Sequence, residues 1–195
     1  MKRFVATLFV TCLVLGAASA NAEDWELAAD DSKIAFGSVK KDTVGEAHHF
    51  SGLSGSVSEG GDATIEIDVT SVETWIDIRN ERMQEHVFNA AAFPKATVTT
   101  KLDMTEFAAL EPGEMTTTTT KVMLGFLGQE IPVEAELFVV ALTGDRVMVT
   151  SDEMLMLSTA DLGISAGIDK LMKLAKLPSI TRVTPVTMRL IFEKK

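Results

Sequence analysis

The segment from Ala63 to Leu102 changes its hydrophobic period twice. Between Ile65 and Val69 the apolar residues alternate with Glu66 and Asp68, which predicts a strand with one apolar and one charged face. A strand of this kind is half-buried, so its apolar face must pack against another layer or line a closed interior.

The middle of the same segment predicts a short helix. Residues that share one helical face recur every three or four positions: Ile76, Arg79, Met83 and Val87. Thr74 fits an N-cap and Asp77 an acidic first turn. Pro94 forbids further helix, and β-rich sequence returns over residues 96–102. A helix inserted between two half-buried strands favours a closed sheet with a plug or lid.

The remaining chain is dominated by predicted strands joined by short turns. Strands are expected over residues 25–27, 33–39, 44–57, 115–126, 130–142, 147–158 and 184–193. A second short helix is expected over residues 168–176. About eight strands with short connections predict a mainly all-β, lipocalin-like, eight-stranded antiparallel barrel with one or two short inserted helices, because closure removes exposed edges.

The N-terminus carries the pattern of a secretory signal peptide. Lys2 and Arg3 precede the apolar run Phe4–Leu15, and Ala20-Asn21-Ala22 is an A-x-A cleavage signal. We expect cleavage after Ala22, a periplasmic location, and a single domain over residues 23–195. The chain's single cysteine lies in the apolar run, so disulfides contribute nothing to the mature protein.

Composition narrows the classes of partner. The chain has 28 acidic and 18 basic residues, a net charge of −10 at neutral pH. Such a surface argues against nucleic acid and against strong attraction to anionic lipid headgroups. Aromatic residues make up 6% and tyrosine is absent, which argues against an outer-membrane barrel with aromatic girdles.

Motifs for catalysis or metal binding are weak. Gly163 to Gly167 match the G-x-S-x-G pattern, but a nucleophile elbow needs a histidine after the serine, and His48, His49 and His86 all precede it. Without cysteine a structural zinc site is not expected. Neither catalytic nor metal-binding residues are predicted. A weak metal site at His48 or His49 is left open.

Residues on the two predicted helices are candidates for a functional role. Arg79, Glu81 and Arg82 suit either an acid-base pair or a structural ion pair, and a buried Arg79 would need a partner. The second expected helix has one apolar face, formed by Ile168, Leu171, Met172 and Ala175. This face suits packing on the barrel, a mobile lid, or a surface that touches a membrane during lipid transfer.

The chain resembles the YceI-like, lipid/polyisoprenoid-binding family. The matching pieces are Ser71-Val72-Glu73-Thr74, Ile78-Arg79-Asn80-Glu81-Arg82-Met83, Phe88, Phe93-Pro94-Lys95-Ala96, His49-Phe50 to Gly55-Ser56-Val57, Leu124 to Val133, and Ala160-Asp161-Leu162-Gly163-Ile164. They occur in the family's order over nearly the whole mature chain. His48 departs from the resemblance, because many members have glycine there.

The resemblance implies a lipocalin-like barrel whose long apolar pore holds a polyisoprenoid, an isoprenoid quinone or a fatty-acid-like chain. Transient membrane contact and a homodimer are left open, and no catalysis or cofactor other than the lipid is expected. Ligand contacts are expected from residues of the pore and its mouth: Phe36, Phe50, Ile65, Ile67, Val69, Ile76, Arg79, Met83, Phe88, Phe93, Leu124, Phe126, Leu162 and Leu171. The alternative function is an enzyme or accessory factor acting on a bound quinone or lipid for a membrane redox partner.

Overall fold

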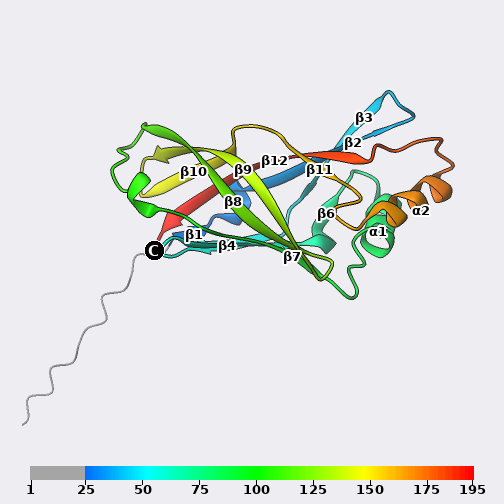
Figure 1. Ribbon diagram of the computed structural model, residues 1–195, viewed down its shortest axis with the longest axis horizontal. Coiled ribbons are helices and arrows are strands. Elements are labelled where there is room, and N and C mark those ends of the chain that lie inside the picture. The colour runs from blue at the N-terminus through cyan, green and yellow to red at the C-terminus, as the bar shows by residue number, and fades with distance from the viewer. Residues whose placement is uncertain (1–24) are drawn as a thin grey trace, which may run out of the picture.

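The computed structural model describes residues 25–195 and is an elongated, closed sheet with two helices at one end (Figure 1). The predicted signal peptide lies outside the described residues. The strands are β1 (Trp25–Leu27), β2 (Lys33–Lys40), β3 (Val44–Phe50), β4 (Leu53–Val57), β5 (Asp62–Asp68), β6 (Val72–Glu73), β7 (Lys95–Lys101), β8 (Met115–Phe126), β9 (Gln129–Leu142), β10 (Arg146–Ser151), β11 (Leu155–Ser158) and β12 (Val183–Lys194). The helices are α1 (Asp77–His86) and α2 (Ser165–Ala175), with short 3₁₀ turns η1 (Ala29–Asp31), η2 (Val69–Ser71) and η3 (Met104–Glu106).

These strands form a barrel of eight antiparallel strands in chain order. Four of the eight are interrupted, each being a pair of short strands in line: β1 with β2, β3 with β4, β5 with β6, and β10 with β11. The interruptions are visible in the pairing of β12, which meets β1 at residues 192–194 and β2 at residues 186–189. The predicted eight-stranded antiparallel barrel with one or two short inserted helices is confirmed, and the helices number two among the described residues.

Strand β12 closes the barrel. One of its edges pairs with β1 and β2, and the other pairs with β10 and β11. Trp25 is opposite Lys194, so the first described strand lies beside the last. Closure pairs both edges of the sheet and encloses the inward faces of all the strands.

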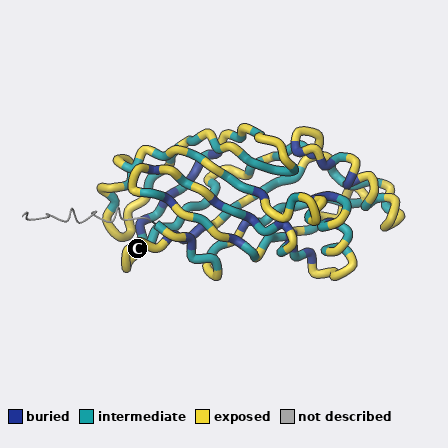
Figure 2. Tube along the Cα trace, turned by 90° about the horizontal axis from the view of Figure 1, so that it is seen from below, coloured by how far each residue is buried: buried dark blue, intermediate teal, exposed yellow. Residues whose placement is uncertain are grey.

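Alternation along the strands fills the interior with apolar side chains. In β9, every second residue from Ala135 to Ala141 is buried, while the residues between them are only partly covered. The same alternation of buried and more exposed positions runs along the barrel wall in Figure 2. The buried polar residues among those described are His48, Thr74 and Thr159.

The structure corrects two sequence-based boundaries. The strand expected over residues 147–158 is broken after Ser151, where pairing with β9 ends at Leu137 and β11 continues on β12 alone. Thr74 is not the N-cap of α1. It is fully buried, and its hydroxyl lies 2.5 Å from Asn80 Oδ1. Ile76 occupies the N-cap position, because Trp75 adopts a positive φ of 65° and turns the chain before the helix begins.

The two helices lie together at one end of the barrel, the end at which the hairpin of β2 and β3 also projects (Figure 1). Their close approach depends on Gly167. A Cβ at this position would lie 2.3 Å from the carbonyl oxygen of His86 and 2.8 Å from Val87 Cα. Backbone packs on backbone at this contact, so α1 and α2 form one cover over the barrel end.

We expect Gly167→Ala to lower the free energy of unfolding by about 1–3 kcal/mol, because the added methyl group must push the backbone of His86 away. Urea unfolding followed by circular dichroism measures the change. Gly45→Ala is the matched control, since a Cβ at Gly45 meets no heavy atom within 4 Å. Equal stabilities of the two variants would contradict this account of the helix contact.

Candidate binding site

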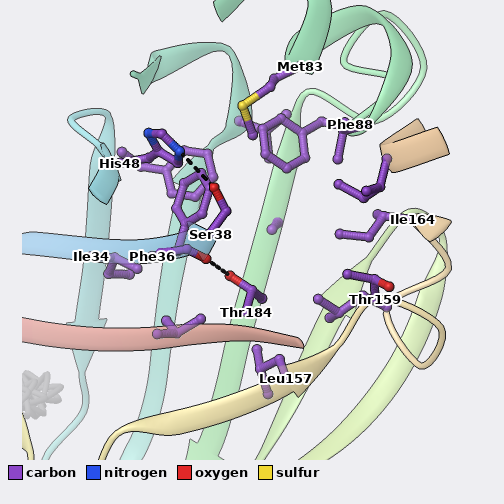
Figure 3. A pocket seen from close by; sticks show the side chains of 18 of the residues that line it. Ile34, Phe36, Ser38, His48, Met83, Phe88, Leu157, Thr159, Ile164 and Thr184 are labelled. Carbon is purple, nitrogen blue, oxygen red and sulfur yellow. Dashed lines mark hydrogen bonds between the residues drawn. The ribbon is translucent and has the colours of Figure 1, made fainter. Parts of the chain in front are cut away.

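A cavity of about 480 Å³ lies between the helices and the inner faces of the strands. Figure 3 shows Met83 and Phe88 on the side of α1, with Ile34 and Leu157 contributed by β2 and β11. The strand side chains face inward because successive residues alternate between the two faces of the sheet. α2 turns its apolar face to the barrel, whereas α1 is largely polar and buries Met83. The lining is predominantly aliphatic and aromatic.

The mouth of this first cavity is at the start of α1. Ile76 and Ile78 both line the cavity, yet 46% and 51% of their surfaces are exposed. Ala175 and Leu177, at and after the end of α2, line it as well. Residues that are both lining and exposed mark the place where the cavity meets solvent, so the cavity opens between the two helices.

A second cavity, of about 670 Å³, occupies the opposite part of the barrel. Trp25, Phe192 and the segment around η3, including Met104 and Phe107, line it. Both cavities are of the size that proteins use for small-molecule ligands.

The two cavities adjoin each other inside the barrel. Three side chains line both of them: Val98 of β7, Val122 of β8 and Met188 of β12. We call these three residues the waist. The interior is therefore two apolar chambers in series, which suits a long, thin apolar molecule better than a compact one.

A wall of phenyl rings runs along the first cavity. The ring centroids of Phe36 and Phe50 are 5.3 Å apart with an interplanar angle of 28°, and Phe50 and Phe88 are 5.6 Å apart. Phe126 lies edge-on to Phe88 at 6.2 Å. Aromatic faces at these separations form a firm, polarizable surface.

Charged groups lie at the rim rather than along the walls. Glu46 of β3 accepts a hydrogen bond from Lys40 at 2.8 Å and from Arg79 of α1 at 2.7 Å. Arg79 Nη2 also donates to the carbonyl oxygen of Thr74. Although burial favours the neutral acid, the bonds from Arg79 and Lys40 outweigh it and lower the pKa of Glu46 below 4.5. This cluster ties α1 to the β2–β3 hairpin.

His48 lies next to this cluster on the same face of β3. It is 4% exposed, and Ser38 Oγ lies 3.3 Å from its Nε2 (Figure 3). Burial, and after it the positive charge of Arg79, lowers the pKa of His48 from 6.5 to about 4. The imidazole is therefore neutral near pH 7.

The structure brings together most of the residues expected to contact a ligand. The following line the first cavity: Phe36, Phe50, Ile67, Val69, Ile76, Arg79, Met83, Phe88, Leu124, Phe126, Leu162 and Leu171. Ile65 lines the second cavity instead. Phe93 is outside both linings. It packs on the β8–β9 turn, where a Cβ at Gly128 would lie 3.1 Å from its ring, because the chain is there entering β7.

Other lining residues were missed from the sequence. Ser38, Glu46 and the waist were not predicted, and His48 was predicted only as a weak metal ligand and as a departure from the family resemblance. Alternation along β2 and β3 could have placed Ser38, Glu46 and His48 on the face of Phe36 and Phe50. Nothing local in the sequence signals the waist, because its three residues come from strands far apart in the chain.

The G-x-S-x-G pattern has a structural role here. Ser165 begins α2, and its hydroxyl lies 3.1 Å from that of Thr159, which is buried beside the first cavity. Among residues 25–195, no group of three or more His, Cys, Asp or Glu side chains is placed to hold a metal ion. No helix in this range is long and apolar enough to cross a membrane.

Comparison with known proteins gives a family and several solved structures. The model of the YceI-like domain matches residues 25–188. A polyisoprenoid binding domain from Saccharophagus degradans, implicated in plant cell wall breakdown, is 36% identical with a TM-score of 0.86, over 88% of this chain and 98% of that one. BcnA of Burkholderia cenocepacia is 14% identical with a TM-score of 0.62, over 85% and 98% of the two chains, and shows the shared fold. No curated protein sequence matches the chain.

The buried His48 makes stability depend on pH. Its pKa is lower in the folded state, so the unfolded chain binds more protons between about pH 4 and 6.5, and the stability present above pH 6.5 is lost as the pH falls. We expect the free energy of unfolding to be about 2 kcal/mol lower at pH 5 than at pH 7. In His48→Phe this part of the pH dependence disappears, whereas His49→Phe keeps it. Urea titrations at the two pH values measure the difference. If the free energy of unfolding of His48→Phe depended on pH as strongly as that of the wild type, this account of His48 would be contradicted.

Proposed function

The chain belongs to the YceI-like family, and on that premise we propose that it binds a single long apolar chain, such as a polyisoprenoid, inside its barrel. The observation that carries the proposal is the pair of apolar chambers that adjoin at the waist. The 36% identical domain described as polyisoprenoid-binding supports the ligand class.

Burial of the chain supplies the affinity. Each buried methylene contributes roughly 0.8 kcal/mol, so ten methylenes contribute about 8 kcal/mol before the costs of ordering are subtracted. No charged partner is needed along the chambers, which agrees with the confinement of Lys40, Glu46 and Arg79 to the rim. We propose that the protein holds its ligand without catalysis, since these rim groups bond to one another and to the backbone.

We propose further that the ligand enters through the mouth during transient contact with a lipid surface. Trp75, Ile76 and Ile78 are exposed around the start of α1, and 74% of the Trp75 surface is open to solvent. Leu174 of α2 is also exposed, and the exposed residues Lys170, Lys173 and Lys176 lie within four positions of it in a chain that is otherwise acidic. Apolar side chains flanked by lysines suit an anionic bilayer surface. The signal-peptide pattern supports a periplasmic site of action.

Native mass spectrometry tests the binding proposal. Protein purified from the periplasm should carry an apolar adduct, identified after solvent extraction, and should bind added long-chain polyprenols. Protein that is free of ligand and has no affinity for polyprenols or other single-chain lipids would overturn the proposal.

A variant at the waist sharpens this test. Val122→Phe should narrow the passage between the chambers and weaken binding of a long polyprenol at least tenfold more than binding of farnesol, which needs one chamber. Met123→Phe is the control, because Met123 is next along β8 but outside both linings. An equal effect on both chain lengths would argue against chambers used in series.

The membrane step has its own test. The chain has two tryptophans, so Trp25→Phe leaves Trp75 as the sole reporter. Its emission should shift to the blue on mixing with phosphatidylglycerol vesicles. Trp75→Ala should weaken vesicle partitioning about thirtyfold, since burial of an aromatic side chain is worth about 2 kcal/mol. Met115→Ala, which removes an apolar residue 58% exposed at the start of β8, should leave partitioning unchanged. Equal losses in both variants would contradict docking at the mouth.

A further inference from the structure

The connection between β7 and β8 is longer than linking two neighbouring strands requires. It runs over residues 102–114, at the end of the barrel opposite the helices (Figure 1). At the same end, β4 and β5 are joined by residues 58–61, and β9 and β10 by residues 143–145. Neighbouring antiparallel strands are usually joined by about two to five residues. We call residues 102–114 the η3 segment, and its additional residues need another explanation.

The η3 segment lies where the barrel wall is incomplete. β7 and β8 pair only at residues 97–99 and 123–125, so the first part of β8 has no strand partner on that side. The segment approaches this part of β8, because the hydroxyl of Thr118 donates to Glu106 Oε2 at 3.0 Å. The η3 segment is therefore part of the wall of the second cavity rather than an external loop.

Apolar side chains of the η3 segment enter the second cavity. Met104, Phe107 and Leu110 all line it, and Phe107 is the largest of the three. Phe107 and Leu110 are half-buried and pack on residues of the inner face of β9: Ala135, Leu137 and Val139. A side chain that enters a cavity takes volume from it. The η3 segment thus decides how much room the second chamber leaves for a ligand.

The walls of the second cavity change from apolar to charged at its outer rim. Glu59, Asp145 and Lys194 line the cavity there and are exposed. Arg146, which is also in the lining, forms an ion pair with Asp31. Apolar carbon that reaches this rim meets water and charges, so it gains little free energy from burial. The affinity for a flexible prenyl chain should therefore increase with chain length only until the two chambers are full.

We propose that Phe107 sets the capacity of the second chamber, and with it the longest prenyl chain that the protein encloses. The inference rests on the proposed function, because it concerns where the bound chain ends. An isoprene unit contributes five carbon atoms, and a phenyl ring contains six. Removal of the Phe107 ring therefore makes room for about one further isoprene unit.

The test measures dissociation constants for all-trans polyprenols that differ by one isoprene unit, starting from farnesol. In the wild type, each added unit should tighten binding at least tenfold up to a limiting length, beyond which the dissociation constant stops falling. Phe107→Ala should raise this limiting length by about one unit. Phe107→Trp, which has a larger ring system, should weaken binding of the limiting chain about tenfold and leave shorter chains unaffected.

Phe93→Ala is the matched control. It removes the same ring from a half-buried phenylalanine that lies outside both linings. Its limiting length should equal that of the wild type. The limiting length compares ligands within one protein, so a loss of stability alone does not imitate the shift.

Three results would overturn the proposal: a limiting length in Phe107→Ala equal to that of the wild type, an equal shift in Phe93→Ala, or a wild-type affinity that continues to rise with every added unit. Phe107→Trp gives an independent answer if Phe107→Ala does not fold, since an unchanged affinity for the limiting chain would overturn the proposal as well. If no polyprenol of any length binds, the proposed lipid-binding function is overturned instead.

Discussion

The pairing of β12 on both of its edges is the constraint on which the rest of the structure depends. With β1 and β2 on one edge and β10 and β11 on the other, the sheet closes and its inward positions become an interior. Without closure, the same alternating side chains would form one exposed apolar face. The chambers, their phenyl wall and the waist all follow from inward positions that face one another across the barrel.

Closure alone leaves the ends of a barrel open, and the chain covers one end with two helices. α1 and α2 come from different connections and meet where Gly167 allows backbone contact. The Lys40–Glu46–Arg79 cluster then fastens α1 to the rim. The cover is thus held at two places, one of them a close-packed backbone contact, the other ionic and partly solvated. An opening movement would break the ionic ties more readily than the packed contact.

Much of this fold could be predicted from the sequence, because the alternation of apolar and polar residues along a strand is a local signal. The strand Met115–Phe126 was predicted with the bounds that the structure gives, and the helix after Thr74 was predicted within a few residues. Thr74 itself was misassigned because its role depends on Asn80 and on the positive φ of Trp75, which no pattern records. The break after Ser151 was missed because it reflects where β9 stops pairing. The apolar lining was largely anticipated, whereas the waist and the burial of His48 depend on tertiary neighbours.

Closure by β12 also makes folding depend on contacts between distant parts of the sequence. β12 pairs with β1 and β2 on one edge, and Trp25 lies opposite Lys194. Before β12 is in place, its neighbouring strands have unpaired edges and the barrel has no enclosed interior. Such non-local contacts form slowly and late in folding. The apolar chambers therefore form only when this last pairing is made.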